Sequence, residues 1–200
     1  MIQYYIGLML ASSATNDSGI AVIDKNNEII LLDKLFTMQD IQHFFDNFSS
    51  LKHSQISISL PTDNTLLVGK WRLMYKFYQT VGLGKHILNR NNWTQRFSNR
   101  GCDYFKTLIE KNIRINRYDI SLTREALHLS SCFKDRSPAD SKALQSALRM
   151  TQGFENLPMN MLPMAQLEAL VGAILSKRIA ENIADEKPIF EFNGMPVFRK

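Results

Sequence analysis

The sequence predicts an α/β fold in which helices flank a mixed β-sheet, made of a three-stranded antiparallel meander plus parallel strands. Three short apolar runs, at residues 4–11, 19–23 and 29–32, follow one another with only polar turn residues between them. This spacing is typical of a meander. A helical pattern and a fourth strand pattern come next, and a strand that returns after a helix most simply lies parallel to the first.

The first apolar run is expected to be the deepest strand. Residues 4–11 are apolar at nearly every position, as in a central strand covered on both faces. The run at 19–23 should pair with it in antiparallel fashion. Residues 25–28 then turn the third strand back alongside the second.

A capping box marks the first helix. Thr37 is followed three residues later by Asp40, so each side chain can reach the other's backbone amide at the positive end of a helix. Apolar residues then recur at helical spacing. The alternating run at residues 55–60 predicts the fourth strand, which Pro61 ends.

The second half of the chain predicts two longer helices. Ser137 precedes a proline, and Asp140 stands at the third helical position, so a helix should run to about Thr151 and stop at Gly153. A second, strongly apolar helix is expected over residues 166–175.

The remaining elements are less regular in their pattern. A helix is expected from Asp103, and residues 114–122 predict a fifth strand. Residues 188–198 predict a small terminal hairpin around an Asn-Gly turn. With 200 residues, no repeat and no low-complexity linker, we expect a single domain over residues 1–200.

Composition excludes several classes of protein. Cys102 and Cys132 stand far apart without a CxxC spacing or a nearby histidine pair, so metal or redox chemistry at cysteine has little support. No segment reaches the roughly 18 unbroken apolar residues of a membrane span, and the start lacks a signal-peptide pattern. We therefore expect a cytoplasmic protein that has no membrane partner and carries reduced thiols.

The positive charge is confined to the middle of the chain. Residues 70–117 carry eleven Lys and Arg but only two acidic residues, whereas residues 1–69 carry three against seven. A basic segment of this kind is typical of a surface that meets a polyanion, although a solvated positive face gives the same pattern.

Four short motifs stand in order along the chain, at residues 6–13, 56–61, 100–103 and 166–171. Together they resemble an uncharacterised bacterial family of predicted nucleases with a ribonuclease-H-like fold. Residues 6–13 are similar to its opening Ile-Gly-hydrophobic-Asp signature, and residues 56–61 to its Ile-Ala-Ile-Asp-Ala-Pro strand end. Residues 100–103 resemble its Arg-x-Cys-Asp segment, and residues 166–171 its late helix. The resemblance implies a single ribonuclease-H-like domain.

The departures from this family bear on activity. The resemblance implies that carboxylates from the first strand, the fourth strand and the last helix hold two divalent metal ions. Met9, Ser59 and Glu168 stand at those positions. A thioether and a hydroxyl cannot replace hard, charged oxygen ligands. The sequence therefore predicts a homologue with a degenerate metal site and no cofactor, acting as a binding or scaffold module.

An alternative keeps catalysis by using displaced acids. Asp17, Asp63 and Glu168 would then hold Mg²⁺ or Mn²⁺ for an active nuclease. The competing interpretation is that Asp17 and Asp63 are solvated turn residues and that Glu168 is partly exposed at a helix start.

Nucleic acid is the partner that the basic segment favours. Aromatic rings could stack on bases and arginines could meet phosphates; aromatic residues tucked under a solvated basic loop are the alternative. The candidate residues are Arg90, Trp93, Arg96, Phe97 and Arg100.

Two further classes have weaker support. Actin-like phosphotransferases share the meander, and Ser12, Ser13 and Thr15 could serve a phosphate loop, but the leading acid and the second domain are missing. Nucleophilic catalysis lacks an elbow motif and an evident cysteine–histidine pair.

Overall fold

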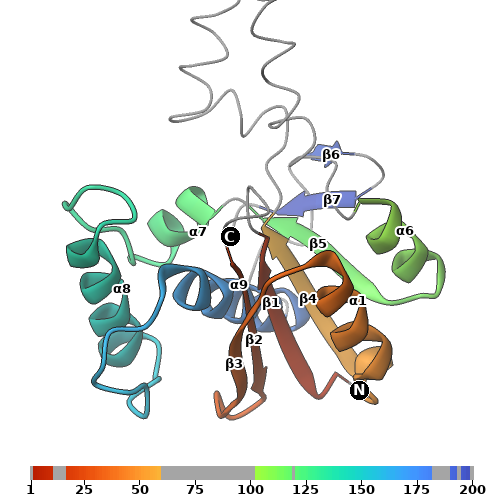
Figure 1. The fold of residues 1–200 in the computed structure, drawn as a ribbon, viewed down its shortest axis with the longest axis horizontal. Coiled ribbons are helices and arrows are strands. Elements are labelled where there is room, and N and C mark those ends of the chain that lie inside the picture. Colours follow the sequence, from red (N-terminus) through yellow and green to blue (C-terminus); the bar gives the residue numbers. More distant parts are fainter. Residues whose placement is uncertain are drawn as a thin grey trace, which may run out of the picture.

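A computed structural model describes residues 2–10, 17–59, 102–118, 120–181, 190–192 and 195–198. These residues form an α/β arrangement in which helices cover both faces of one mixed sheet (Figure 1). The strand order is β3-β2-β1-β4-β5-β7-β6. The strands are β1 (Tyr4–Met9), β2 (Ser18–Asp24), β3 (Ile29–Leu35), β4 (Ser54–Ser59), β5 (Arg114–Tyr118), β6 (Phe190–Phe192) and β7 (Met195–Phe198).

Strand directions follow the predicted pattern. β1, β2 and β3 pair in antiparallel fashion as a meander, and β4 lies parallel to β1 on its other side. β5 continues the parallel part of the sheet beside β4. The predicted order of meander, helix and returning parallel strand is therefore confirmed.

Two groups of helices cover the two faces of the sheet. On one face, α1 and α6 pack against the side chains of Ile6, Leu8 and Ile58. On the other, α9 lies directly over β1 and β2, with α7 and α8 beside it. The helices are α1 (Met38–Asn47), the short 3-10 turn η1 (Leu51–His53), α6 (Cys102–Glu110), α7 (Ile120–Ala126), α8 (Pro138–Thr151) and α9 (Met164–Ala180).

Both predicted helix caps are present. The Thr37 hydroxyl accepts a hydrogen bond from the Asp40 amide at 3.1 Å, and the Asp40 carboxylate accepts one from the Thr37 amide at 2.8 Å. At α8, Ser137 accepts from the Asp140 amide at 3.2 Å. Gly153 follows this helix with φ +79°, which glycine adopts without strain.

The fifth strand is shorter than predicted. The expectation for residues 114–122 is wrong beyond Tyr118, because helix α7 begins at Ile120. Tyr118 is turned inward, and its hydroxyl donates a 2.8 Å hydrogen bond to the Glu168 carbonyl of α9. In α7, Arg124 reaches a buried carboxylate sixteen residues away. These long-range contacts favour a helix where the local apolar alternation favours a strand.

Helix α9 packs unusually close to the sheet. A Cβ atom on Gly7 would overlap the Ala169 carbonyl oxygen, and one on Gly19 would overlap the Ala165 carbonyl oxygen. Glycine at these two positions lets the helix backbone rest on the strand backbones. α9 is consequently buried all round from Met164 to Ser176.

The end of the chain joins the sheet. β6 and β7 pair in antiparallel fashion, and β7 lies parallel to β5, an attachment that the hairpin pattern alone does not indicate. Within the described residues, the helices are too short or too polar to cross a membrane.

Candidate functional site

The two strand positions at which the resemblance implies metal ligands are occupied by Met9 and Ser59. These two residues pair directly with each other on the adjacent parallel strands β1 and β4. β1 and β4 pair from Tyr4 with Ser54 to Met9 with Ser59. Met9 packs in the hydrophobic cluster under α9. Ser57 bonds to Ser176 of α9, so Ser59, two residues further along the strand, faces the same side. Both side chains are buried on the α9 face of the sheet.

Glu168 lies on that same face, in the second turn of α9. Its side chain is 2 % exposed, so the expectation of a partly exposed residue at a helix start is wrong. Oε2 forms an ion pair with Nη1 of Arg136 at 3.1 Å, without the alignment of a good hydrogen bond. Because α9 lies flat on the sheet, even its second turn is enclosed by α7, by the sheet and by the loop that carries Arg136.

Burial dominates the electrostatics of Glu168. Loss of solvent raises the pKa of Glu168 to about 7; the positive charges of Arg136 and Arg124 lower it, and Asp135 and Asp140 raise it further. Burial therefore favours the protonated form of this carboxyl, whereas the neighbouring arginines favour the charged form.

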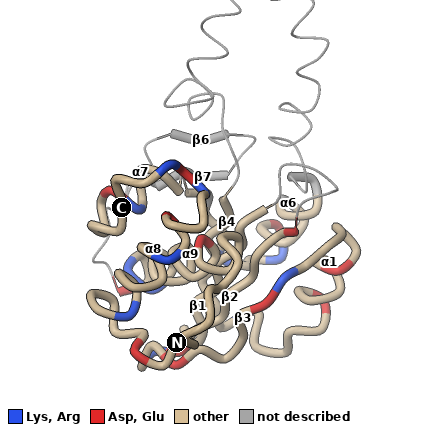
Figure 2. The backbone as a smooth tube through the Cα atoms, turned by 60° about the vertical axis from the view of Figure 1, so that its left-hand side comes forward, with Lys and Arg blue, Asp and Glu red and all other residues tan. Residues whose placement is uncertain are grey.

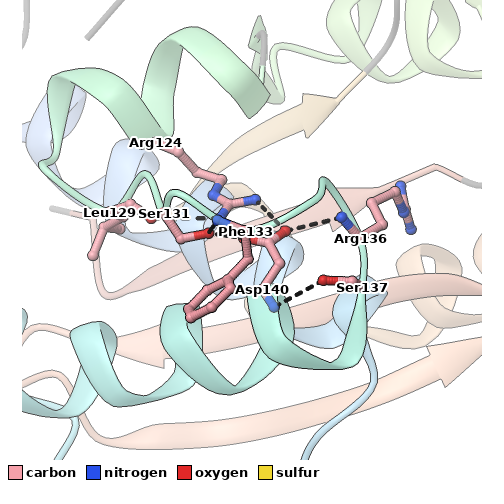
Figure 3. Close-up of polar contacts among 7 residues, drawn as sticks. All are labelled: Arg124, Leu129, Ser131, Phe133, Arg136, Ser137 and Asp140. Carbon is pink, nitrogen blue, oxygen red and sulfur yellow. Dashed lines mark hydrogen bonds and ion pairs between the residues drawn. The ribbon is translucent and has the colours of Figure 1, made fainter.

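A second buried carboxylate organises the loop that carries Arg136. Asp140 accepts hydrogen bonds from both terminal nitrogens of Arg124, at 2.6 and 3.2 Å, and from the Ser131 hydroxyl at 2.6 Å. The Arg136 amide donates a further bond to it at 2.9 Å. Figure 3 shows these donors converging on Asp140 from α7 and from both ends of the loop.

This network fixes the backbone at Arg136. Arg136 has φ +57°, a left-handed conformation that non-glycine residues adopt rarely. The bond from its amide to Asp140 stabilises that conformation and directs the guanidinium over Glu168. Burial raises the pKa of Asp140, but the bonds from Arg124, Ser131 and Arg136 outweigh it and lower the pKa to about 2. Asp140 therefore stays ionised at neutral pH.

The donor set around Met9 and Ser59 does not fit a pair of divalent metal ions. A thioether, a hydroxyl and a single carboxylate that already faces a guanidinium provide at most one negative charge. Across the described part of the chain, three His, Cys, Asp or Glu side chains nowhere gather closely enough to hold a metal ion.

The other predicted residues divide into two groups. Asp17 is described and forms a 2.8 Å ion pair with Lys34, with both side chains about one-third exposed. The rest lie outside the described residues, so their roles stay predictions. They are Asp63, the phosphate-loop candidates Ser12, Ser13 and Thr15, and the nucleic-acid candidates Arg90, Trp93, Arg96, Phe97 and Arg100.

Sequence reasoning missed the two arginines of this site. Asp140 is identifiable from the sequence as a helix-capping residue, but its larger role is to bind Arg124. The pairing of Arg136 with Glu168 spans 32 positions and has no local sequence signal. The one clue is that Glu168 is the only charge in an otherwise apolar helix segment, where a carboxylate that becomes buried needs a cation.

Comparison with known proteins adds no family to this description. The chain matches no protein-family model, and a search of curated proteins finds no match.

Proposed function

We propose that this chain is a ribonuclease-H-like nuclease homologue that lacks the two-metal site and acts as a cytoplasmic binding or scaffold module on nucleic acid. The observation that carries the proposal is the pairing of Met9 with Ser59 on the face where Glu168 is buried against Arg136. The resemblance expects carboxylates at these three positions. A guanidinium beside the one remaining carboxylate supplies the positive charge that a metal ion would otherwise supply.

The fold supports the same proposal. The meander, the parallel strand after the first helix and the late apolar helix over β1 occur in the order that the resemblance implies. Strand and helix order alone do not specify an activity, because one fold hosts many functions. The chemical argument therefore rests on the donor set.

Charge favours nucleic acid as the ligand. The described part of the chain carries acidic and basic residues side by side (Figure 2). By sequence, residues 70–100 hold seven Lys and Arg and no acidic residue. A segment of that composition attracts phosphates and makes binding dependent on salt.

Binding and cleavage can be tested on the same purified chain. We expect labelled single-stranded DNA or RNA to bind at low ionic strength, with an affinity that falls steeply between about 50 and about 200 mM salt. The same oligonucleotides should stay intact with Mg²⁺ or Mn²⁺. Absence of binding at low salt would overturn the binding module. Metal-stimulated cleavage that disappears in Glu168→Ala would instead establish the active nuclease with displaced acids.

A gain-of-ligand variant tests the metal argument directly. Met9→Asp together with Ser59→Asp restores carboxylates at both strand positions, and adding Arg136→Gln removes the competing guanidinium. We expect this triple variant to gain a thermal shift with Mn²⁺ that the parent chain lacks. A parent chain that is itself stabilised by Mn²⁺, with loss of the shift in Glu168→Gln, would contradict the proposal.

A further inference from the structure

The loop between α7 and α8 exposes an aromatic ring although its backbone is tightly held. Phe133 is 52 % exposed, one of the few large apolar side chains left in solvent within the described residues. Its amide donates to Ser131, whose hydroxyl in turn binds the buried Asp140. The ring is therefore presented to solvent by an anchored backbone, which reduces the entropy lost when a ligand covers it.

Two cations follow this ring along the chain. Lys134 is exposed, and the Arg136 side chain is 48 % exposed even though its Nη1 faces Glu168. Figure 3 shows Phe133 and Arg136 extending to different sides of Asp140. Asp135 lies between the two cations in sequence, and the ion pair with Glu168 engages Nη1 of Arg136 while about half of the side chain stays exposed.

The loop also lies close to the carboxyl ends of β4 and β5. Arg136 contacts α9, whose second turn is bonded to Tyr118 at the carboxyl end of β5. Ser59, the last residue of β4, pairs with Tyr118, and residues 60–101 follow it in the chain. Ligands of α/β proteins commonly bind at the carboxyl ends of strands.

We propose that Phe133, Lys134 and Arg136 form a contact surface for single-stranded nucleic acid, in which the Phe133 ring stacks on a base and the two cations contact neighbouring phosphates. This inference rests on the proposed function and specifies a binding surface for it. Stacking on an aromatic ring is tolerant of sequence, and the cations add dependence on salt. Double-stranded ligands keep their bases stacked inside the helix, so they cannot use Phe133 in this way.

The test is fluorescence anisotropy with labelled oligo-dT, oligo-U and a DNA duplex, each titrated at several salt concentrations. Phe133→Ala should weaken binding of both single strands by roughly tenfold and leave duplex binding unchanged. Lys134→Gln should reduce the slope of log affinity against log salt by about 0.7. The matched control is Phe36→Ala, because Phe36 is also exposed, at 60 %, but lies beside Asp33 and Asp40, whose charges repel phosphates.

Arg136 is tested with variants that do not leave the buried Glu168 carboxylate without its partner. Arg136→Gln with Glu168→Gln removes both charges of the ion pair and keeps the net charge constant, so weaker binding reports the guanidinium itself. Glu168→Gln alone should strengthen binding, because Arg136 is then fully available. If the parent chain binds single strands but the Phe133, Lys134 and double variants bind equally well, this surface is wrong and the proposed function stands. A parent chain that does not bind overturns both.

Discussion

The Gly7 backbone lies directly against the Ala169 carbonyl of α9, with the space for a side chain already occupied. This contact sets the distance between the central strand and the helix that carries Glu168. The same close approach recurs at Gly19, which is paired with Met9 across β1 and β2. Two glycines therefore determine how near α9 comes to the candidate site.

Gly7→Ala is expected to destabilise the fold severely. The new methyl group would overlap backbone atoms of α9, which cannot turn aside as a flexible side chain can. We expect a loss of about 3 kcal/mol or more in the free energy of unfolding, at the upper end of overpacking effects. Urea denaturation followed by circular dichroism measures it. Ala126→Ser, which adds one atom at an exposed position, should change stability by less than about 0.5 kcal/mol; equal stability of the two variants would contradict the packing argument.

How far the sequence predicts this fold depends on how local the determining interaction is. The capping box at Thr37 and the side-chain cap at Ser137 act within four residues, and both helix starts are recognisable without coordinates. The meander is likewise fixed by short turns between neighbouring runs. The helix at Ile120 is not recognisable, because Arg124 and Tyr118 form their contacts with α8 and α9 far along the chain.

The candidate site divides in the same way. Met9 and Ser59 can be placed beside each other from the predicted strand order alone. The burial of Glu168 cannot be predicted from the sequence, because it depends on how closely Gly7 and Gly19 let α9 approach the sheet. The pairing of Glu168 with Arg136 cannot be predicted either, because the position of Arg136 depends on its left-handed backbone conformation, which the bond to Asp140 stabilises.

Asp140→Asn should be strongly destabilising. The substitution keeps the size of the side chain but leaves the buried Arg124 guanidinium without its counter-charge. A loss of about 3–5 kcal/mol is expected from chemical denaturation. Glu181→Gln breaks the exposed pair with Lys177, at 4.0 Å, and should cost less than about 1 kcal/mol. A small effect at Asp140 would mean that the network does not hold the loop.

The loss of stability at low pH should reflect the ionisation of Asp140. The pKa of Asp140 is about 2 in the folded chain against 3.8 for the unperturbed group. A lowered pKa means that the unfolded chain binds protons first, so stability is lost as pH falls from about 4 to about 2. Denaturation midpoints measured through this window should fall for the parent chain more steeply than for Asp140→Asn. Parallel curves would show that other carboxylates govern acid unfolding.

Ionisation of Glu168 should lower the stability of the fold as pH rises, whereas ionisation of Asp140 raises it. Its pKa is about 7 in the folded chain and 4.5 when unperturbed, so between these values the folded state binds more protons than the unfolded state. Stability should therefore decrease as pH rises from about 4.5 to about 7, with a slope approaching about 1.4 kcal/mol per pH unit. Glu168→Gln should flatten the curve in this window, whereas the exposed control Glu155→Gln should reproduce the parent slope. A parent curve that rises through this range would exclude a buried, uncharged Glu168.

A buried chain of polar side chains joins α9 to the centre of the sheet. Gln55 donates to Asn116 at 2.9 Å, and Asn116 donates to the Ser57 hydroxyl at 2.9 Å. Ser57 and Ser176 lie 2.7 Å apart, and Ser176 donates to the Ile6 carbonyl at 2.8 Å. The Ser57 hydroxyl also lies 3.2 Å from Asn116 Oδ1, so its one proton has two possible acceptors, Asn116 and Ser176. These bonds link β4 and β5 to Ser176 of α9 and to the Ile6 carbonyl of β1.

Each of the two serines should contribute to the free energy of unfolding through the bond that joins them. Ser176→Ala removes the 2.7 Å partner of the fully buried Ser57 hydroxyl, and Ser57→Ala leaves the Asn116 side-chain amide without the hydroxyl that accepts from it. Each variant should lose about 1–3 kcal/mol, whereas Ser146→Ala on the exposed side of α8 should be nearly neutral. In the double variant the mutual loss occurs only once, so the effects should fall short of additivity by at least about 0.5 kcal/mol. Strict additivity in urea denaturation would mean that the two hydroxyls act separately.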